Sequence, residues 1–574
     1  MARDELSLGD VSLRCAWELV DELARWGVEH ACVSPGSRST PLALALDRHQ
    51  SIQVHVHLDE RSSAFFALGL AKASEGPVAV ACTSGTAAAE LFPAVVEASQ
   101  ARVPLVVLTA DRPPRLRGTG ANQTIDQQEL YGGYARAYLE PPPPTLGADV
   151  RAEWRAAGEV AARSARYGPE PNGVIHPGPV HVNCCFDEPL TPSGDVELRP
   201  THERVLHAET LDLVLSTEIL DTVSGVERGL VVAGAMHRVA PAIIEVAGRL
   251  GWPVLAEPLS HLRRPGTLAA GQALSADPGW RGRFAPDILL QVGATPTTRA
   301  TQAIIGSARS LVVVADGSLD PDPDGRAVIT SSLGATRVAQ DLLSALPDPP
   351  TESSPWFTAW READSSARRA IHDLLDSWDE PFEGRVARDL AAWIPDGGTL
   401  VAGSSMPIRD LDHFMGPREG LLVLANRGAS GIDGFVSTTL GVAATDAPTF
   451  ALCGDLTFLY DVGALLWNAR RGINAVFVVV NNGGGAIFDF LPQRDLPEHD
   501  RLFTTPHGVD IGAVCAAAGV GHVRVDRAAE LRPALDSAAR AVGIQVIEVS
   551  SDRATNVARH EQVAAAVAIA ISGI

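Results

Sequence analysis

The chain of 574 residues is too long for a single hydrophobic core, so we expect about three domains. Hydrophobic residues make up 46% of it and charged residues 20%, which is a globular composition, and no run of about eighteen uncharged apolar residues predicts a membrane span. The formal net charge of −22, without any basic run, argues against nucleic-acid binding.

The first part of the chain alternates helix and strand patterns. Helices are expected at 12–26, 61–73 and 151–166, and strands at 30–33, 53–58, 78–82, 105–109 and 180–183. Strands separated by helices predict parallel βαβ units.

Two further blocks follow. Apolar strands are expected at 230–233, 288–292 and 311–315 in a block of about 203–346, and at 421–425, 449–453, 475–480 and 544–549 in a block from about 356. A Pro- and Ser-rich linker at 347–355 separates the two. We therefore predict an α/β fold with three doubly wound parallel-sheet domains, at residues 1–195, 203–350 and 356–574.

The cysteines and the lysine exclude further classes of protein. The seven cysteines are scattered and form no Cys-x-x-Cys pair, so we expect neither a disulfide framework nor a thiolate zinc site. Lys72 is the only lysine and is not part of a Gly-Lys-Ser/Thr phosphate-binding loop. A pyridoxal-phosphate enzyme would need Lys72 for its Schiff base, which its helical surroundings disfavour.

The first residues do not resemble a signal peptide, so we expect a cytoplasmic protein.

Two strand ends in the third block carry oxygen ligands. Asp455 and Asn482 are one strand-helix-strand crossover apart, with an amphipathic helix expected to about residue 471, so both lie where open α/β sheets bind ligands. With a carbonyl near Gly484 they would give Mg²⁺ about three oxygen ligands beside a diphosphate. Alternatively, Asp455 caps a helix and Asn482 is a left-handed turn residue.

The end of the strand at 53–58 allows other interpretations. Glu60 begins a helix, where an isolated glutamate is usually a solvated residue that the helix dipole favours. His55, His57 and Asp59 alternate and so share one strand face, as a small metal site would require. A polar strand face at a subunit contact explains the same pattern.

Five segments in order, spanning nearly the whole chain, resemble the family of thiamine-diphosphate-dependent 2-succinyl-5-enolpyruvyl-6-hydroxy-3-cyclohexene-1-carboxylate synthases of menaquinone biosynthesis. The segments are 34–42, 59–61, 109–114 with 118–123, 425–434, and 454–457 with 481–484. The last contains a Gly-Asp and Asn-Asn pair similar to the diphosphate-anchoring motif of thiamine-diphosphate enzymes. The resemblance implies a pyrimidine-binding, a central and a diphosphate-binding domain, as in decarboxylase-like members.

The resemblance also implies roles for individual residues. Asp455, Asn482 and the Gly484 carbonyl are expected to hold Mg²⁺, with Mn²⁺ as an alternative, and Glu60 to activate the cofactor through its aminopyrimidine ring. The expected cofactor-binding residues are Glu60, Ser405, Ile432, Gly454, Asp455 and Asn482. The expected substrate-binding residues are Ser37, Arg38, Arg112, Asn122, Gln123, Arg299, Ser405, Arg409, Arg427, Ile487, Phe488 and Leu491.

The implied activity is a decarboxylation of 2-oxoglutarate with loss of CO₂, followed by conjugate addition of the succinyl-semialdehyde carbanion to isochorismate. Both substrates carry two carboxylates, so several arginines are physically sensible despite the negative total charge. The apolar residues are expected to exclude water. Family sites form between subunits, so we expect a homodimer or homotetramer.

Other functions remain open at this point. Within the superfamily, the alternative is another 2-oxoacid decarboxylase or an acetohydroxyacid-type synthase. A dinucleotide-dependent oxidoreductase is disfavoured because no Gly-x-Gly-x-x-Gly follows a strand. Two positions depart from the family pattern: Gly403-Ser404-Ser405 stands where relatives often have Gly-Asn-Ser, and Thr298-Arg299 where some have Lys-Arg.

Overall fold

The computed structural model describes residues 6–168, 176–201, 217–236, 239–315 and 321–574. They belong to two compact units. Unit 1 is drawn from Met1–Leu211, Asn426–Ala447 and Leu459–Ile473, and unit 2 from Asp212–Ala425, Pro448–Phe458 and Asn474–Ile574. Among the described helices, none is both long and apolar enough to cross a membrane.

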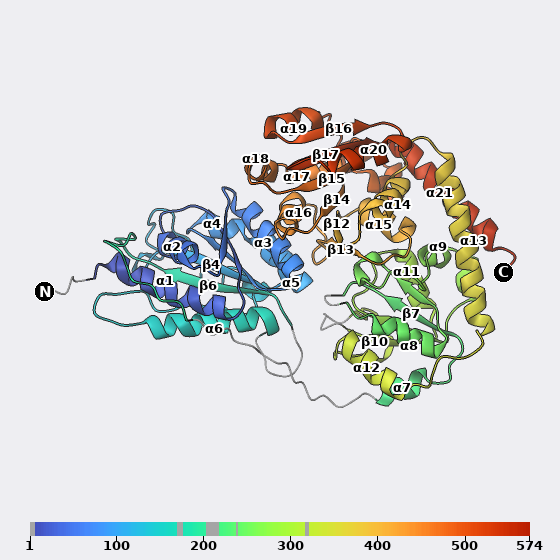
Figure 1. Ribbon diagram of the computed structural model, residues 1–574, viewed down its shortest axis with the longest axis horizontal. Helices are drawn as coiled ribbons and strands as arrows, with labels where there is room; N and C mark the ends of the chain where they lie inside the picture. Colours follow the sequence, from blue (N-terminus) through green and yellow to red (C-terminus); the bar gives the residue numbers. More distant parts are fainter. Residues whose placement is uncertain (1–5, 169–175, 202–216, 237–238, 316–320) are drawn as a thin grey trace. The chain divides into compact units, whose positions relative to one another are not determined.

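Sheet A, in unit 1, has six strands that all pair in parallel. Their order is β2 (Gln53–Val56), β1 (His30–Val33), β3 (Val78–Cys82), β4 (Leu105–Asp111), β6 (Pro179–Cys185) and β5 (Tyr138–Leu139). Helices α1 (Leu8–Arg25), α2 (Thr40–Arg48) and α6 (Arg151–Tyr167) bury one core against it. Helices α3 (Glu60–Ser74), α4 (Thr86–Glu90) and α5 (Phe92–Ala101) follow β2 and β3 (Figure 1).

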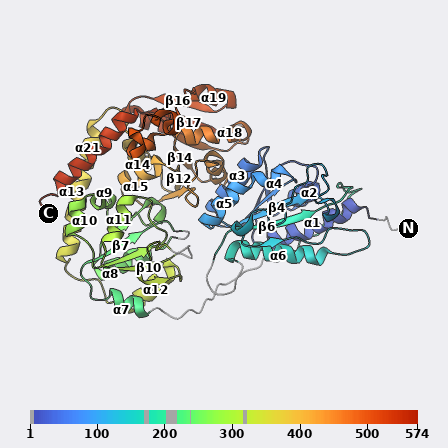
Figure 2. The ribbon, with the colours of Figure 1, turned by 180° about the vertical axis from the view of Figure 1, so that it is seen from behind.

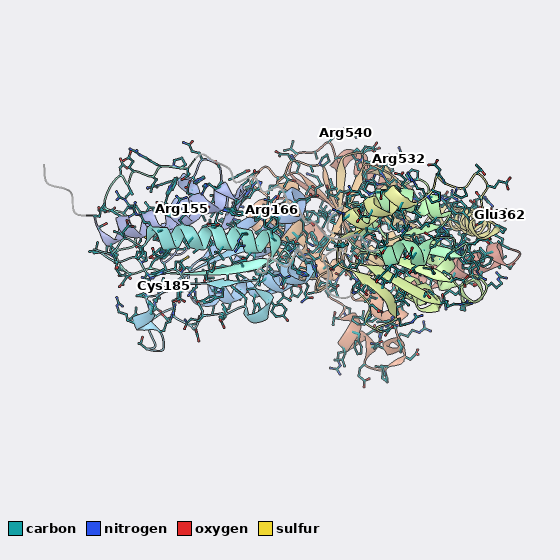
Figure 3. The ribbon with its side chains drawn as sticks, turned by 90° about the horizontal axis from the view of Figure 1, so that it is seen from below. Arg155, Arg166, Cys185, Glu362, Arg532 and Arg540 are labelled. Carbon is teal, nitrogen blue, oxygen red and sulfur yellow. The ribbon has the colours of Figure 1, made fainter. Side chains whose placement is uncertain are left out.

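Helices α1 and α6 are joined by charge as well as by apolar packing. Arg155 and Arg166 both project from α6 in Figure 3. Arg155 makes ion pairs with Glu18, Asp21 and Glu22 of α1, at 2.5, 2.9 and 2.8 Å. These contacts fix the helix pair beneath the sheet.

Sheet B, in unit 2, is also parallel. Its order is β11 (Ala327–Ser331), β10 (Ser310–Val314), β9 (Ile288–Val292), β7 (Gly229–Ala233) and β8 (Val254–Ala256). One core contains α7 (Thr217–Val223), α8 (Ala242–Leu250) and α12 (Ala335–Ala345). The other contains α9 (Gly271–Ala276), α10 (Pro278–Arg283), α11 (Arg299–Ser307), α13 (Pro355–Ser377) and α21 (Arg553–Ile571). The last two helices run side by side in both ribbon views (Figures 1 and 2).

Sheet C completes unit 2. Its order is β13 (Leu421–Ala425), β12 (Gly398–Ala402), β14 (Thr449–Gly454), β15 (Ala475–Asn481), β17 (Ile544–Ser550) and β16 (Gly521–Val525). Helices α14 (Glu383–Trp393), α15 (Met406–Phe414) and α20 (Ala528–Ala538) share its main core. Further helices are α17 (Asp455–Tyr460) and α19 (Ile511–Ala518), while α16 (Phe435–Ala443) and α18 (Gly463–Asn468) belong to unit 1.

Sheets A and C have the same strand order, in which the second strand lies outside the first and the third lies on its other side. The chain thus changes direction across the sheet between β1 and β3 in sheet A, and between β12 and β14 in sheet C. Open α/β sheets bind ligands outside the carboxyl ends of the strands at such a switch point. The fold therefore offers two switch points, one in each unit.

The predicted α/β class with parallel sheets is confirmed, but some predicted elements were wrong. The single helix expected to about residue 471 is two short helices, α17 and α18, because the chain turns at Asp461. The Asp461 carboxylate is buried and accepts the Ser437 N–H at 2.7 Å, so it serves α16 instead of continuing a helix. The strand expected at 53–58 ends at Val56, and the start expected for the middle block at residue 203 lies outside the described residues.

Candidate active site

Asp455 and Asn482 follow neighbouring strands of sheet C. Gly454 of β14 pairs with Val480 of β15, so the two polar side chains leave the sheet at the same edge. The N–H of Gly484 donates to Asp455 Oδ2 at 2.9 Å, which closes the turn after β15 over the carboxylate. The structure thus brings together the three residues expected to hold a cation.

The Asn482 amide has one satisfied end and one unsatisfied end. Its Nδ2 donates to Glu383 Oε1 at 3.0 Å. Its Oδ1 is buried and has no hydrogen-bond partner in the described part of the chain. A buried acceptor without a partner costs about 1–3 kcal/mol, so a cation is the natural ligand for it. Asn482 does not have a positive φ, so the alternative of a left-handed turn residue is wrong.

His507 also contacts Asp455, and the sequence did not indicate it. Its Nδ1 accepts the Val509 N–H at 3.0 Å, so a neutral ring carries its proton on Nε2. That Nε2 lies 3.2 Å from Asp455 Oδ2 and donates to it. The two residues are 52 positions apart, and no spacing rule links them.

The backbone around the two strand ends leaves room for a ligand. A Cβ added at Gly454 or Gly483 would meet no atom within 4 Å, so both turns face open space. A Cβ at Gly484 would lie 2.3 Å from the Thr504 carbonyl oxygen, so this glycine permits a close packing of two turns. The Gly484 carbonyl accepts the Ala486 N–H at 3.0 Å and keeps a second lone pair. The donor set fits Mg²⁺ with a diphosphate.

Ser405 and Arg409 lie on the other side of the same switch point. The sequence did not predict β12, which places Ser405 just beyond its carboxyl end. Ser405 has a φ of +75°, an unusual conformation for a non-glycine residue, and such strain is common at ligand sites. The Arg409 guanidinium donates to the Ser405 carbonyl at 2.6 Å.

The remaining candidates in unit 2 are less enclosed. Ile487 and Phe488 belong to a 3₁₀ helix, Ala486–Phe490, and Leu491 follows it; all three are half-buried. Arg299 is exposed at the start of α11. Its neighbour Thr298 donates to Asp412 Oδ2 of α15 at 3.0 Å.

In unit 1, Glu60 is the first residue of α3. Asp59 caps this helix by accepting the Ser62 N–H at 3.0 Å, so Glu60 is left half-buried at the carboxyl edge of sheet A. Burial raises the pKa of the Glu60 carboxyl above its usual value, and the charges of Asp59 and Glu90 act in the same direction. A carboxyl with a raised pKa suits proton transfer near neutral pH.

Arg38 and Arg112 are near each other at the same edge of sheet A. Arg38 is buried and donates to the Phe186 carbonyl at 3.0 Å and to Glu188 at 3.2 Å. Arg112 donates to the Ser84 hydroxyl. Burial lowers the pKa of Arg112, and the positive charge of Arg38 lowers it further. Two partly desolvated guanidinium groups of like charge favour an anion between them.

Gln123 contacts Ser84 as well, in the loop that follows β3. Its Nε2 donates to the Ser84 carbonyl at 2.9 Å, and the Ser84 hydroxyl donates to the Gln123 carbonyl at 3.0 Å. Ser37, Asn122 and Gln123 are exposed. The substrate candidates of unit 1 therefore surround the sheet A switch point.

Lys72 positions the segment that carries Arg427 and Ile432. Its ammonium lies 3.7 Å from a Glu97 carboxylate oxygen, and both side chains are buried. Glu97 in turn accepts the N–H groups of Gly428 and Ala429 at 2.9 and 2.6 Å. The lysine is part of a structural ion pair, which removes the basis for a Schiff-base role.

His55 and His57 form no metal site with Asp59. Both imidazoles pack on Phe66, with ring centroids 5.3 and 4.5 Å away, while Asp59 caps α3. Burial lowers the pKa of His55 to about 4 and that of His57 to about 3. Within the described ranges, no three His, Cys, Asp or Glu residues are placed to hold a metal.

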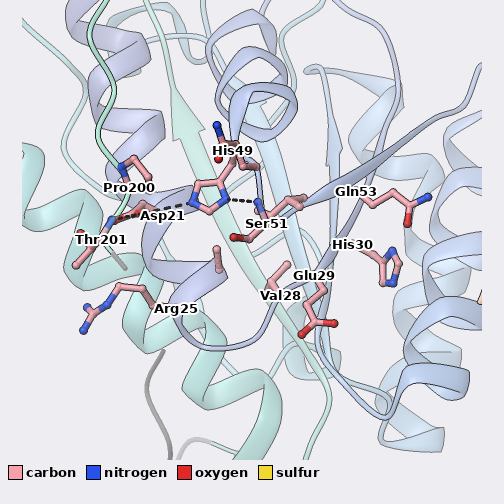
Figure 4. A pocket seen from close by; sticks show the side chains of 13 residues that line it. Asp21, Arg25, Val28, Glu29, His30, His49, Ser51, Gln53, Pro200 and Thr201 are labelled. Atoms are coloured by element: carbon pink, nitrogen blue, oxygen red, sulfur yellow. Dashed lines mark hydrogen bonds and ion pairs between the residues drawn. The ribbon is translucent and has the colours of Figure 1, made fainter. Parts of the chain in front are cut away.

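A cavity of about 530 Å³ in unit 1 lies away from these residues (Figure 4). It is at the amino ends of β1 and β2, where His49 lies 3.4 Å from Asp21 Oδ1 and the Thr201 N–H donates to the same oxygen at 2.9 Å. The candidate residues occupy the carboxyl ends of the strands. This cavity is therefore not part of the candidate site.

Comparison with known proteins points in the same direction. Residues 14–130 match the family described as "Thiamine pyrophosphate enzyme, N-terminal TPP binding domain", and residues 411–549 match the corresponding C-terminal TPP binding domain. The chain is 42% identical to the 2-succinyl-5-enolpyruvyl-6-hydroxy-3-cyclohexene-1-carboxylate synthase of Thermobifida fusca, over 96% of this chain and 98% of that protein. Synthases of the same name from Saccharopolyspora erythraea and Geobacillus thermodenitrificans are 40% and 39% identical, over 97% and 94% of this chain and 98% and 94% of their own length.

Proposed function

The chain belongs to the family of thiamine-diphosphate-dependent 2-succinyl-5-enolpyruvyl-6-hydroxy-3-cyclohexene-1-carboxylate synthases, and on this premise we propose that it catalyses the reaction in that name. It decarboxylates 2-oxoglutarate and adds the remaining four-carbon unit to isochorismate, releasing CO₂. The observation that carries the proposal is the pair of buried Arg38 and half-buried Arg112 at the strand edge that also bears Glu60. Such a pair suits a substrate with more than one carboxylate.

The cofactor is anchored at the edge of sheet C. Thiamine diphosphate, when bound, supplies a nucleophilic carbon and an acceptor for the electrons released by decarboxylation. Asp455, Asn482 and the Gly484 carbonyl hold Mg²⁺ or Mn²⁺, and support comes from the unpartnered Asn482 Oδ1 beside the Asp455 carboxylate. Gly454 and Ser405 would help to hold the diphosphate, and Ile432 would help to hold the rest of the cofactor.

Glu60 handles the proton in this site. A half-buried carboxyl with a raised pKa both donates and accepts a hydrogen bond at modest cost near neutral pH. With thiamine diphosphate bound, Glu60 would hydrogen-bond a ring nitrogen of the cofactor and hold the proton there, and the cofactor would supply the reactive carbon.

The substrates are bound by guanidinium groups and enclosed by apolar side chains. Arg38, Arg112, Arg299, Arg409 and Arg427 bind carboxylates, and Ser37, Asn122, Gln123 and Ser405 supply further polar contacts. Ile487, Phe488 and Leu491 exclude water, which matters because early protonation would release succinic semialdehyde instead of the product.

The protein assembles as a homodimer or homotetramer with sites shared between subunits. Support comes from exposed apolar side chains on or beside β2 and α18, all in unit 1: Val56, Leu58, Tyr460, Leu466 and Trp467. The indole N–H of Trp467 donates to the Val56 carbonyl at 2.8 Å, which joins the two elements into one surface. An apolar surface of this kind next to Glu60 fits a second copy of the chain.

The three domains are assigned to residues 1–195, 203–350 and 356–574, as pyrimidine-binding, central and diphosphate-binding domains. Support comes from the sheets, since the strands of sheets A, B and C fall one set in each range.

The proposal is tested by measuring CO₂ release from 2-oxoglutarate with and without isochorismate, in the presence and absence of thiamine diphosphate. We expect release that needs the cofactor and is strongly stimulated by isochorismate, with a product whose mass equals both substrates less CO₂. Turnover of pyruvate in preference to 2-oxoglutarate would instead indicate an acetohydroxyacid-type synthase or another decarboxylase.

A further inference from the structure

The two asparagines at the end of β15, Asn481 and Asn482, are each held by a different buried glutamate. Asn481 donates from Nδ2 to Glu548 at 2.7 Å, and its Oδ1 accepts the Gly483 N–H at 3.2 Å, so both ends of this amide are used. Asn482 donates from Nδ2 to Glu383 at 3.0 Å, and its Oδ1 has no partner in the described residues. Only the second amide is left with an oxygen for a ligand.

Glu383 lies in an unusual environment for a carboxylate. It is the first residue of α14, its exposed fraction is 4%, and among the described residues no arginine or lysine forms an ion pair with it. Its contacts are the Asn482 amide and the Ser551 hydroxyl at 3.1 Å, both through Oε1. A buried carboxyl group whose hydrogen bonds come only from neutral donors costs stability, and a role in the site would account for that cost.

The chemistry of the carboxylate decides which way the Asn482 amide points. Burial raises the pKa of the Glu383 carboxyl, and the charge of Asp410 acts in the same direction. Its Oε1 accepts hydrogen bonds whether or not the group carries a proton on Oε2, so this oxygen binds the NH₂ end of the Asn482 amide and repels the amide oxygen. With the NH₂ end held by Glu383, the oxygen is directed away from it. The opposite orientation would present N–H groups to a cation, which is repulsive.

We propose that Glu383 is a positioning residue for the metal site, because its carboxylate holds the Asn482 side chain in the orientation that turns Oδ1 toward the cation. This inference rests on the proposed cofactor site. Partners that orient metal ligands typically change metal affinity by about 10- to 100-fold when they are removed. Glu383 touches neither substrate nor cofactor in this account and acts through Asn482.

The test measures binding of Mn²⁺ to the full-length protein in saturating thiamine diphosphate, by the electron paramagnetic resonance signal of the free ion. Glu383→Leu removes the acceptor, and we expect a dissociation constant about 10- to 100-fold higher. Glu383→Gln keeps an oxygen at the same place, so we expect affinity within about threefold of wild type. Glu383→Asp stays polar but withdraws the acceptor, and we expect at least about a tenfold loss.

Glu548→Leu is the matched control, because it removes a buried glutamate from the neighbouring asparagine, and its Mn²⁺ affinity should stay within about threefold. Thermal unfolding of the metal-free variants shows whether each is folded. If Glu383→Leu is not folded, the Mn²⁺ affinity of Glu383→Asp decides the test. Asn482→Ala serves as the reference for loss of the ligand itself.

Wild-type affinity in Glu383→Asp and Glu383→Leu, together with a large loss in Asn482→Ala, would overturn the positioning role and leave the proposed site intact. Wild-type affinity in Asn482→Ala would overturn the site and the inference together. An equal loss in Glu383→Leu and Glu548→Leu would contradict a specific role for Glu383.

Discussion

Single residues divide the chemistry into an anchoring part and a reacting part. Asp455 and Asn482 present oxygen atoms at the edge of sheet C, which suits a hard divalent cation. Glu60, Arg38 and Arg112 present a carboxyl and two guanidinium groups at the edge of sheet A. The first set is expected to govern cofactor affinity, and the second set turnover and substrate choice.

Replacing Glu60 by glutamine should separate binding from turnover. Because glutamine cannot exchange a proton, we expect turnover to fall by roughly 10² or more while cofactor affinity changes by less than about tenfold. Burial raises the pKa of Glu60, so in wild type the acid limb of the kcat/KM profile should lie above pH 4.5, activity increasing as the carboxyl ionises. Steady-state rates against pH and a thiamine diphosphate titration measure both effects. Unchanged turnover would remove Glu60 from this role.

Replacing Arg112 by methionine should weaken the recognition of dicarboxylates. Loss of one charge-assisted hydrogen bond to a buried carboxylate costs about 2–3 kcal/mol, so we expect kcat/KM for 2-oxoglutarate to fall about 30- to 150-fold. Arg115→Met is the control, since Arg115 is exposed and pairs with Asp187. If both variants behave alike in 2-oxoglutarate kinetics, Arg112 does not bind this substrate.

The site residues that could be predicted from the sequence are those that belong to a motif or lie at the two ends of a strand-helix-strand crossover. Asp455 and Asn482 were predictable because parallel strands separated by one crossover end at the same edge. His507 and Glu383 were not, because their contacts with the motif depend on how distant loops and helices pack, and single buried His and Glu residues give no sequence signal.

Among the elements, the packing of α3 against α16 holds the segment with Arg427 and Ile432, which precedes α16 in unit 1. A Cβ at Gly69 would lie 2.0 Å from the Thr438 carbonyl oxygen, and one at Gly441 would lie 2.1 Å from that of Phe66. The two helices thus approach through glycines, and α16 directly follows the segment with Arg427 and Ile432. This close packing fixes where that segment ends.

Asp461, between α17 and α18, should make unit 1 sensitive to pH. Burial raises the pKa of this carboxyl to about 6, against a usual value of 3.8. An acid that binds its proton more tightly when folded contributes stability below about pH 4, and this contribution is lost as pH rises through 6. At about 1.4 kcal/mol per pKa unit, the whole contribution is about 3 kcal/mol, and wild type loses all of it only when the pH is well above 6.

Asp461→Asn keeps an oxygen to accept the Ser437 N–H but does not titrate. We compare the free energy of unfolding of Asp461→Asn with that of wild type at each pH. The variant's value minus the wild-type value should be about 3 kcal/mol larger at pH 7 than at pH 4. Urea unfolding across this range measures the difference. Parallel stability curves would show that Asp461 is not the titrating group.

The elements missed in the sequence have physical reasons for being missed. Helix α16 is buried along all of its length, so its apolar run has no helical period and resembles a buried strand. Strand β12 has only five residues and begins with a glycine, which weakens its strand signal. The long interrupted helix before residue 471 could not be foreseen, because Asp461 turns inward to serve a helix from another part of the chain.

At the scale of the whole molecule, sheets A and C repeat one strand order. The sequence predicts parallel βαβ units but not which strand lies beside which, since that depends on how helices pack on both faces. Each switch point carries one set of candidate residues. This arrangement agrees with the proposal that sites are shared between subunits.

Mixing two inactive variants tests whether sites are shared between subunits. Glu60→Gln and Asp455→Ala should each be nearly inactive alone. If Glu60 of one subunit serves Asp455 of another, then a mixed dimer keeps one intact site, and a random mixture should recover about a quarter of wild-type activity. Glu60→Gln mixed with the double variant is the control, because no combination restores a site. No recovery after verified subunit exchange would place both residues in one chain's site.

Anomalous diffraction from crystals grown with Mn²⁺ and thiamine diphosphate tests the central claim most directly. We expect one strong manganese peak bonded to Asp455, to the Asn482 amide oxygen and to the Gly484 carbonyl, with the diphosphate completing the coordination. A peak elsewhere, with Asn482 Oδ1 not bonded to the metal, would contradict it.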